Sequence, residues 1–326
     1  MLKQITIRLC WALGSLLVMS LFTFWLMHLT PGNYFDSLKL NPQISPETIS
    51  RLENMYGVNK PFLVQWWAWV VNILKGEWGY SFYYNVPVAH LIGSRLGNTF
   101  ILSLASIILT WAVAIPLGVW AALRHNTIVD RTLSLLSYVA FATPGFFLAI
   151  LLLYLVSQWG ILPLGGMHSA NYDELGWWGK LIDLAKHLLI PTIVLSLASI
   201  GSLQRIMRAN LLNVLRQPFM TALRAKGLSE GRVIYVHALR NAFNPMVTLL
   251  GYEFASLLSG AALIEIIVSW PGLGTLMLTA VRAKDIYVVM ASVVLGGMML
   301  LIGNLLADIL LRKLDPRIQD ETKREL

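Results

Sequence analysis

Two acidic residues lie inside an otherwise apolar stretch, where a carboxylate could bind a polar solute. Glu253 and Glu265 both fall between residues 243 and 268, where most side chains are apolar or small. A carboxylate is costly to hold in such surroundings, so each residue is a candidate for contact with a polar solute. The two residues are 12 positions apart, which is roughly 120° around a helix, so they do not share one face.

A basic segment, residues 219–247, is the second feature that could do specific work. It reads FMTALRAKGLSEGRVIYVHALRNAFNPMV, and Glu230 is its only acid against four basic residues. The stretch from Phe219 to Lys226 consists of good helix formers. Gly227 is expected to end that helix, because glycine readily adopts the left-handed conformation of a helix cap.

A second short helix should follow this glycine. Ser229 can cap it, and Glu230 is favourable near its N-terminus. We expect this helix to reach about Leu239, after which Asn244 and Pro245 open the next apolar span. The pattern therefore predicts a helix–glycine–helix hairpin.

The hairpin carries two small residues, Ala222 and Ala225, which would permit close approach by another surface. From the pattern alone, an alternative remains open. A basic loop between apolar runs can serve only to fix the orientation of the chain in a membrane.

Most of the chain is suited to lipid rather than to water. Of its 326 residues, 56% are hydrophobic and 13% are charged, whereas a soluble domain has about 25% charged residues. A bilayer core needs about 20 helical residues, and the sequence predicts an all-α polytopic protein with six such spans. These are Leu9–Met27, Thr99–Leu123, Thr132–Val156, His187–Gln204, Phe243–Val268 and Tyr287–Leu311.

Prolines mark irregular points in the predicted spans. Pro191 is placed in the first turn of the fourth span, where a missing N–H costs little. Pro144 and Gly145 are expected to kink or loosen the third span. Arg205 and Arg208, at the end of the fourth span, are expected to reach lipid headgroups.

The basic residues predict the orientation of the chain. With both termini in the cytoplasm, sixteen of the 25 Lys and Arg residues fall on the cytoplasmic side, as the positive-inside rule favours. The net charge of +8 is concentrated at the ends of apolar runs, which favours this role over nucleic-acid binding. The basic hairpin is then cytoplasmic.

A segment of about 70 residues, 30–98, lies outside in this orientation. It contains VQWWAWVVNIL, and two interpretations remain open for its tryptophans. They could place an amphipathic helix in the headgroup region of the membrane. Alternatively, Trp66, Trp67 and Trp69 could pack inside a small extracytoplasmic subdomain.

Several motifs together resemble permease subunits of binding-protein-dependent ABC importers, in the dipeptide, oligopeptide and nickel group. The hairpin carries RAKGLS and HALRNA followed by Pro245, which are similar to the cytoplasmic signature of that group. Ala222-Leu223 stands where the common pattern has Thr-Ala. The resemblance extends along nearly the whole chain through LTPGN, GVNKPFLVQWWAWVVNILKGEWGYSF, NTFILSLASIILTWAVAIPLGVWAAL, ATPGFFLAILLL, SWPGLG and LDPRI. The long segment after the first span resembles the first of the two permease subunits.

The resemblance implies a type I ABC importer transmembrane fold and a coupling role for residues 219–245. A cytoplasmic ATPase subunit would grip the hairpin, and the coupling residues would be Ala222, Arg224, Ala225, Lys226, Gly227, Leu228, Ser229 and Glu230. The chain has no G-x-x-x-x-G-K-[ST] motif, so ATP and Mg²⁺ would be bound by that partner and this chain would have no cofactor and no catalytic residue. A second permease subunit and an extracytoplasmic solute-binding protein are the other implied partners.

The resemblance also separates the two intramembrane acids. Glu265 lies just before SWPGLG, where the family has an acid too, and a structural role is favoured for it. Glu253 stands where relatives more often have an uncharged polar residue, so it is the better candidate for contact with cargo. Pro144 is a third, weaker candidate for the substrate pathway.

The expected domains follow from these assignments. Residues 1–28 form the N-terminal end and first membrane helix, and residues 29–96 an extracytoplasmic segment. Residues 97–311 form a five-helix permease core with the coupling hairpin at 213–242, and residues 312–326 a cytoplasmic tail. The expected location is a bacterial-type inner membrane.

Two other classes of function are known among polytopic membrane proteins. An ATP-independent secondary transporter or channel is the alternative, but it has no need of an ATPase-binding hairpin. An integral membrane enzyme is disfavoured, since the sequence has no H-E-x-x-H and no G-x-S-x-G motif. His28, His168 and His187 are not spaced as a metal-ligand set, so the sequence does not support a nickel site.

Overall fold

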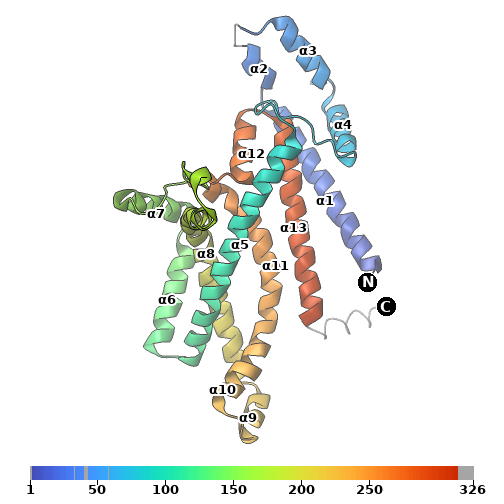
Figure 1. The fold of residues 1–326 in the computed structure, drawn as a ribbon. Coiled ribbons are helices and arrows are strands. Elements are labelled where there is room, and N and C mark those ends of the chain that lie inside the picture. The colour runs from blue at the N-terminus through green and yellow to red at the C-terminus, as the bar shows by residue number, and fades with distance from the viewer. Residues whose placement is uncertain (1, 33, 40–42, 58, 315–326) are drawn as a thin grey trace. The chain divides into compact units, whose positions relative to one another are not determined.

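The computed structural model of the protein describes residues 2–32, 34–39, 43–57 and 59–314. Most of the predicted tail, from residue 315 onward, lies outside these ranges. The described residues form helices joined by short connections, with one isolated β-bridge between Tyr80 and Pro87 (Figure 1). The chain divides into two compact units, Met1–Thr99 with Pro271–Met299, and Phe100–Trp270 with Leu300–Leu326.

The first unit contains the start of the chain and the segment predicted to lie outside the membrane. Its helices are α1 (Leu2–Leu29), α2 (Tyr34–Lys39), α3 (Pro46–Tyr56), α4 (Phe62–Leu74) and α12 (Leu273–Arg282), with the first parts of α5 (Val88–Leu123) and α13 (Ile286–Leu314). Its cores join distant parts of the sequence: Val88 and Ile92 of α5 pack with Leu276 of α12 and Val288 of α13.

Each of the two interpretations of α4 accounts for some of its tryptophans. Trp69 is buried among Phe24, Met290 and Val294, and the indole N–H of Trp66 donates to Ser20 Oγ at 3.1 Å. Trp67, in contrast, is 61% exposed. One face of α4 therefore packs against other helices of the unit, as a subdomain would require, while the other face stays apolar and exposed.

The second unit is a bundle around the long helix α8 (Trp177–Leu215). Its other elements are most of α5, α6 (Ile128–Ala142), α7 (Gly145–Trp159), a short 3₁₀ turn η1 (Tyr172–Glu174), α9 (Pro218–Ala225), α10 (Glu230–Arg232), a π-helical turn η2 (Val233–Ala238) and α11 (Leu239–Ile267). Both α6 and α11 pack alongside α8 (Figure 1).

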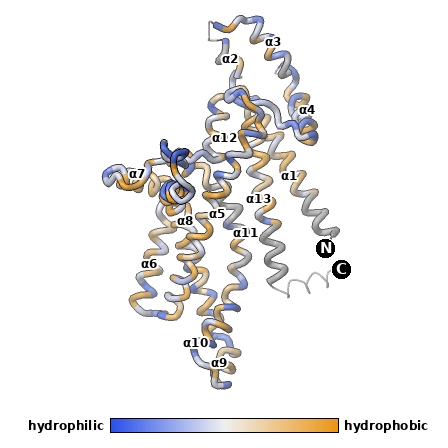
Figure 2. The backbone as a smooth tube through the Cα atoms, viewed as in Figure 1, coloured by the Kyte–Doolittle hydropathy of each residue, from blue (hydrophilic) through white to orange (hydrophobic). Residues whose placement is uncertain are grey.

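Four helices of the described chain, α1, α5, α8 and α13, are long and apolar enough to cross a membrane, and α6 with α7 makes a fifth span if the bent pair is counted as one. Helix α11 has 29 residues, more than the roughly 20 that a bilayer core requires. In order along the chain these helices overlap the six predicted spans, and among the described residues four or five of the six meet the criterion of length and hydropathy. Hydrophobic residues dominate the helices of the second unit, and hydrophilic residues mark the tip formed by α9 and α10 (Figure 2).

The third span is not the single helix that was predicted over Thr132–Val156. It consists of α6 and α7, which meet at 98°. Pro144 has no N–H to continue the helix and disfavours helical backbone in the preceding residue, so Thr143 is extended, with φ −79° and ψ 119°. Helix α7 restarts at Gly145. The expected irregularity at Pro144 is confirmed, and it is a break rather than a kink.

Two other prolines were placed wrongly in the prediction. Pro191 lies in the interior of α8, because the helix begins ten residues before the predicted start, at Trp177. Pro245 lies inside α11 and does not open it, since η2 leads into α11 at Leu239 without a break. Neighbouring helices bury Pro191 and sustain a helix that local sequence preferences would end. Pro245 is exposed, and there the helix simply continues from η2.

The prediction for Arg208 was also wrong, because its guanidinium pairs with a carboxylate. Headgroup contact by Arg205 stays a prediction. The guanidinium of Arg205 lies over the rings of Tyr138 and Phe141 in α6, at 4.8 and 5.1 Å from their centroids. Arg208 forms an ion pair with Asp130, also in α6.

Candidate functional site

The hairpin, residues 218–238, begins as the sequence predicts. Gln217 has extended backbone, and Pro218 takes the first helical position, where its fixed φ suits the helix and its missing N–H costs little. Helix α9 ends at Ala225, and Gly227 has a φ of +77°. This left-handed conformation favours glycine over residues with a Cβ. The expectation that Gly227 ends the first arm is confirmed.

The hairpin is anchored by one buried side. Met220 of α9 and Val233 of η2 have no exposed surface, and they pack in one core with Met207 and Leu211 near the end of α8. Leu228, at the turn, packs partly against the same core. Burying a large apolar side chain contributes roughly 1.5–3 kcal/mol, so these contacts fix the position of the hairpin on α8.

The opposite side of the hairpin is exposed. Seven of the eight predicted coupling residues are exposed, and Leu228 is half-buried: the exposed ones are Ala222, Arg224, Ala225, Lys226, Gly227, Ser229 and Glu230. The exposed side also includes large apolar side chains that were not among the predicted coupling residues. Phe219 is 40% exposed, Tyr235 61% and Val236 52%. Exposed apolar residues beside small residues form a surface suited to protein contact.

An ion pair closes the hairpin across its turn. Arg224 donates from Nε to Glu230 Oε2 at 3.0 Å and from Nη2 to Oε1 at 2.7 Å. Ser229 occupies the position before α10, but its side chain makes no capping bond, contrary to the prediction. The hydrogen bonds from Arg224 lower the pKa of Glu230, so the pair is present at neutral pH and is lost only as pH falls through that lowered pKa.

The second arm differs from the predicted short α-helix. Residues Val233–Ala238 form a π-helical turn, which continues directly into α11. Such turns hold an extra residue relative to α-helix and recur at functional sites. The hairpin is therefore joined without a break to the helix that carries both intramembrane acids.

The two intramembrane acids have different surroundings. Glu253 is partly exposed, and its Oε2 accepts the indole N–H of Trp111 at 2.6 Å. Ser199 also forms a hydrogen bond with this carboxylate. Glu265 is fully buried beside Ile264 and Val268, whose core also includes Trp270.

The surroundings of the two acids thus distinguish Glu253 from Glu265. Burial of Glu265 suits a structural role, whereas Glu253 stays partly accessible. Neither acid lies in the hairpin, and Pro144 forms the break between α6 and α7. The substrate-pathway assignments of Glu253, Glu265 and Pro144 stay predictions.

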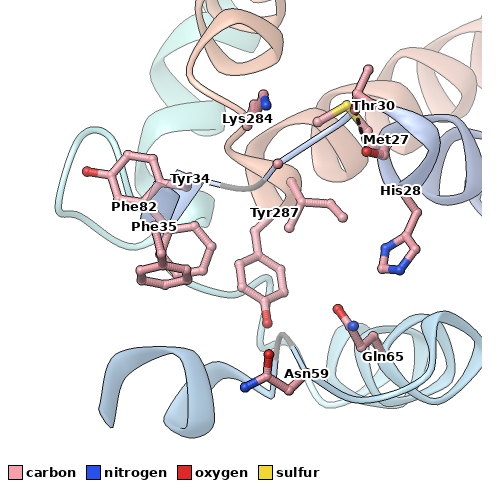
Figure 3. Close-up of a pocket in the computed structure, with 12 residues that line it drawn as sticks. Met27, His28, Thr30, Tyr34, Phe35, Asn59, Gln65, Phe82, Lys284 and Tyr287 are labelled. Atoms are coloured by element: carbon pink, nitrogen blue, oxygen red, sulfur yellow. Dashed lines mark hydrogen bonds between the residues drawn. The ribbon is translucent and has the colours of Figure 1, made fainter. Parts of the chain in front are cut away.

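A separate cavity of about 280 Å³ lies within the first unit (Figure 3). Phe82 contacts both Phe35 and Tyr287, with ring centroids 5.1 and 5.4 Å apart. Asn59, Gln65 and His28 add polar atoms to the lining, and Lys284 donates to the backbone oxygen of Pro31. None of the sequence-predicted site residues lines this cavity.

Comparisons with known proteins agree with this architecture. The family described as binding-protein-dependent transport system inner membrane component matches residues 114–320, and its N-terminal membrane component matches residues 1–105. The chain is 35% identical over 314 residues to the oligopeptide transport system permease protein AppB of Bacillus subtilis, covering 96% of this chain and 98% of the relative. It is 34% identical over 336 residues to the dipeptide transport system permease protein DppB of Escherichia coli K12, covering 98% and 99%.

The anchored side of the hairpin generates a first prediction. Met220→Ala leaves a cavity in the core beneath α9 and costs roughly 2–5 kcal/mol locally. Transient opening should then increase trypsin cleavage after Arg224 or Lys226 in the membrane-inserted chain at least roughly tenfold. Phe219→Ala is the matched control, because that neighbouring side chain is exposed and should change cleavage little. Equal cleavage of both variants would show that the core does not hold the hairpin.

Proposed function

Because the chain belongs to the family of inner-membrane components of binding-protein-dependent transport systems, we propose that separate ATPase subunits dock on its hairpin and drive it. The chain is a permease subunit that forms half of the translocation pathway of an ATP-driven importer. The observation that carries the docking proposal is the two-sided hairpin, with Met220 and Val233 fully buried and the small residues Ala222 and Ala225 exposed.

The exposed side of the hairpin has the chemistry of a protein interface. Small residues permit close approach, and Phe219 and Tyr235 offer apolar and aromatic contact area. With Arg224 engaged by Glu230, the charges of Lys226 and Arg232 remain for acidic groups of a partner. The docked subunits bind ATP and Mg²⁺. The permease contributes a contact surface and no catalytic group.

Movement of the hairpin reaches the membrane through two connections. The core of Met220 and Val233 holds it to α8, and η2 joins it to α11. ATP can switch the membrane helices between inward-open and outward-open states only if the docked subunits bind one of those states better. A secondary transporter has no use for such a surface, so the importer remains the one function proposed.

The complete transporter contains further partners. A second, homologous permease subunit completes the pathway, and an extracytoplasmic solute-binding protein delivers cargo to the segment 29–96. The distribution of Lys and Arg supports both termini in the cytoplasm and the hairpin at the inner face. The domain boundaries 1–28, 29–96, 97–311 and 312–326 follow this topology.

Peptides are the proposed cargo, since the relatives are named as oligopeptide and dipeptide permeases. Glu253 is the proposed contact for the peptide's ammonium group. Its carboxylate is held by two neutral donors, Trp111 and Ser199, and keeps partial exposure in the middle of α11. A charge-assisted hydrogen bond contributes roughly 1.5–3 kcal/mol, which suits recognition of a free amine. Pro144 and the buried Glu265 shape the pathway rather than contact the peptide.

Docking on the hairpin predicts a specific effect at its turn. Gly227→Val places a β-branched residue at positive φ, at a cost of roughly 1–2 kcal/mol, although no atom lies within 4 Å of the added Cβ. Transport by the reconstituted complex should fall at least roughly tenfold, with ATPase activity either uncoupled from transport or lost with the subunits, while the permease still inserts.

Gly231→Val is the matched control for this variant. Gly231 is also exposed and its Cβ would also meet open space, but its φ lies outside the left-handed region. It should keep most of the transport activity. Normal assembly and normal transport in Gly227→Val would count against docking at this turn.

The proposed contact between Glu253 and the peptide predicts an effect on uptake. Glu253→Gln keeps the size of the side chain and removes its charge, so uptake of Ala-Ala by the complete transporter should fall roughly tenfold. Stimulation of ATPase activity by the loaded solute-binding protein should change little, because the hairpin is intact. Glu253→Asp, which keeps the charge, should retain most uptake. Wild-type uptake by Glu253→Gln would remove this residue from the pathway.

A further inference from the structure

An ion pair joins α6 to the end of α8 that carries the hairpin. Asp130, in the first turn of α6, is 3% exposed. Arg208 of α8 donates to it from Nε to Oδ1 at 2.5 Å and from Nη2 to Oδ2 at 2.7 Å. This two-bond arrangement fixes the direction between the helices as well as the distance, because the guanidinium and the carboxylate are both planar.

The connection between α5 and α6 closes onto the same carboxylate. The backbone N–H of Asn126 donates to Asp130 Oδ2 at 3.0 Å, from a residue with a φ of +64°. Nδ1 of His125 lies 3.2 Å from Oδ2 and 3.2 Å from Nη2 of Arg208. One buried carboxylate therefore ties together the turn after α5, the start of α6, and α8. We call Asp130, Arg208, His125 and Asn126 the inner clamp.

Further contacts join the same two helices over the preceding turns of α8. Arg205 lies against the rings of Tyr138 and Phe141, and the hydroxyl of Ser137 donates to Gln204 Oε1 at 2.6 Å. The helices are also very close at Gly201, where an added Cβ would lie 2.5 Å from the backbone oxygen of Ser137. The inner clamp is thus the last of a series of contacts along one side of α6.

Stability alone does not account for this ion pair, in which the Asp130 side chain is 4% exposed and the Arg208 side chain 25%. The free energy of removing both charges from water commonly cancels their attraction, and apolar pairs of similar volume are often as stable or more stable. An arginine near a helix end could also extend toward headgroups and keep its charge hydrated. Arg208 instead turns inward to α6, which points to a directional connection between two helices.

The hairpin and the inner clamp meet on the last turns of α8. Met207 and Leu211 hold the buried side of the hairpin, and Arg208 lies between them in sequence with its side chain on α6. The turn between α5 and α6 and the hairpin both lie at the lower end of this unit in Figure 1. A displacement of the hairpin therefore reaches Arg208 through a single short stretch of helix.

We propose that the inner clamp makes α6 move with α8 when the hairpin is displaced, so that Asp130 and Arg208 are positioning residues for coupling. This inference rests on the proposed function. Helix α6 leads to the break at Thr143 and Pro144, so α7 is carried through the same connection. Without the clamp, α8 moves with the hairpin while α6 lags, and ATP is hydrolysed with less solute moved.

The test measures solute transported per ATP hydrolysed by the complete reconstituted complex, with Ala-Ala as the transported probe. Asp130→Asn and Arg208→Gln should each lower that ratio at least roughly fivefold, while the ATPase subunits still copurify. The double variant Asp130→Arg with Arg208→Asp should recover part of the ratio. Arg131→Gln is the control, because Arg131 is the exposed neighbour of Asp130, and it should keep the wild-type ratio.

A second variant tests the same proposal without leaving a single unpaired charge in the core, which could itself cause misfolding. Asp130→Leu with Arg208→Met removes both charges and should fold, because it leaves no lone ion in the core. Its apolar side chains allow sliding, so its ratio should also fall. A wild-type ratio in this variant, or in either single variant, would overturn the proposal. If the wild-type permease retained no ATPase subunit at all, the proposed function itself would fail instead.

Discussion

The packing of Met220 and Val233 onto Met207 and Leu211 is the interaction on which the rest of the structure depends. Without this core, residues 218–238 would be a basic loop between two membrane helices, which is the alternative that the sequence left open. With it, one side of the hairpin is fixed to α8 and the other side is available to a partner. A force applied at the exposed side is then delivered to a helix of 39 residues rather than absorbed by a loose connection.

Polar contacts in an apolar surrounding connect the helices of the second unit. Asp130 with Arg208 connects α8 to α6, and Trp111 with Glu253 connects α5 to α11. Each places a charge or an acid where desolvation is costly, which is the opposite of what a helix bundle needs for stability alone. Directional bonds at these points are suited to a protein that must change between defined arrangements, because apolar packing by itself permits gradual sliding.

The sequence predicted the broad plan well and the interior poorly. The apolar runs, the glycine turn at Gly227 and an irregularity at Pro144 all depend on local chemistry, namely side-chain hydropathy and backbone freedom, and these were predicted. That the irregularity is a full break at 98° was not predicted. The helix continues through Pro191 because neighbouring helices bury it, and through Pro245 because α11 continues from η2. A single sequence shows neither context. The pairing of Arg208 with Asp130 joins positions 78 residues apart. An acid at the very start of an apolar run was the only available signal for it.

The most direct test of docking is a cross-link from the exposed face of the hairpin. Cys10 is the chain's only cysteine, so Ala222→Cys in a Cys10→Ser background gives one reactive thiol at a defined place. In the assembled, transporting complex, a short bifunctional reagent should join this position to the ATPase subunit, and Met220→Cys, which lies in the core, should give no such product. A complex that transports normally yet yields no cross-link from Ala222→Cys would contradict the account.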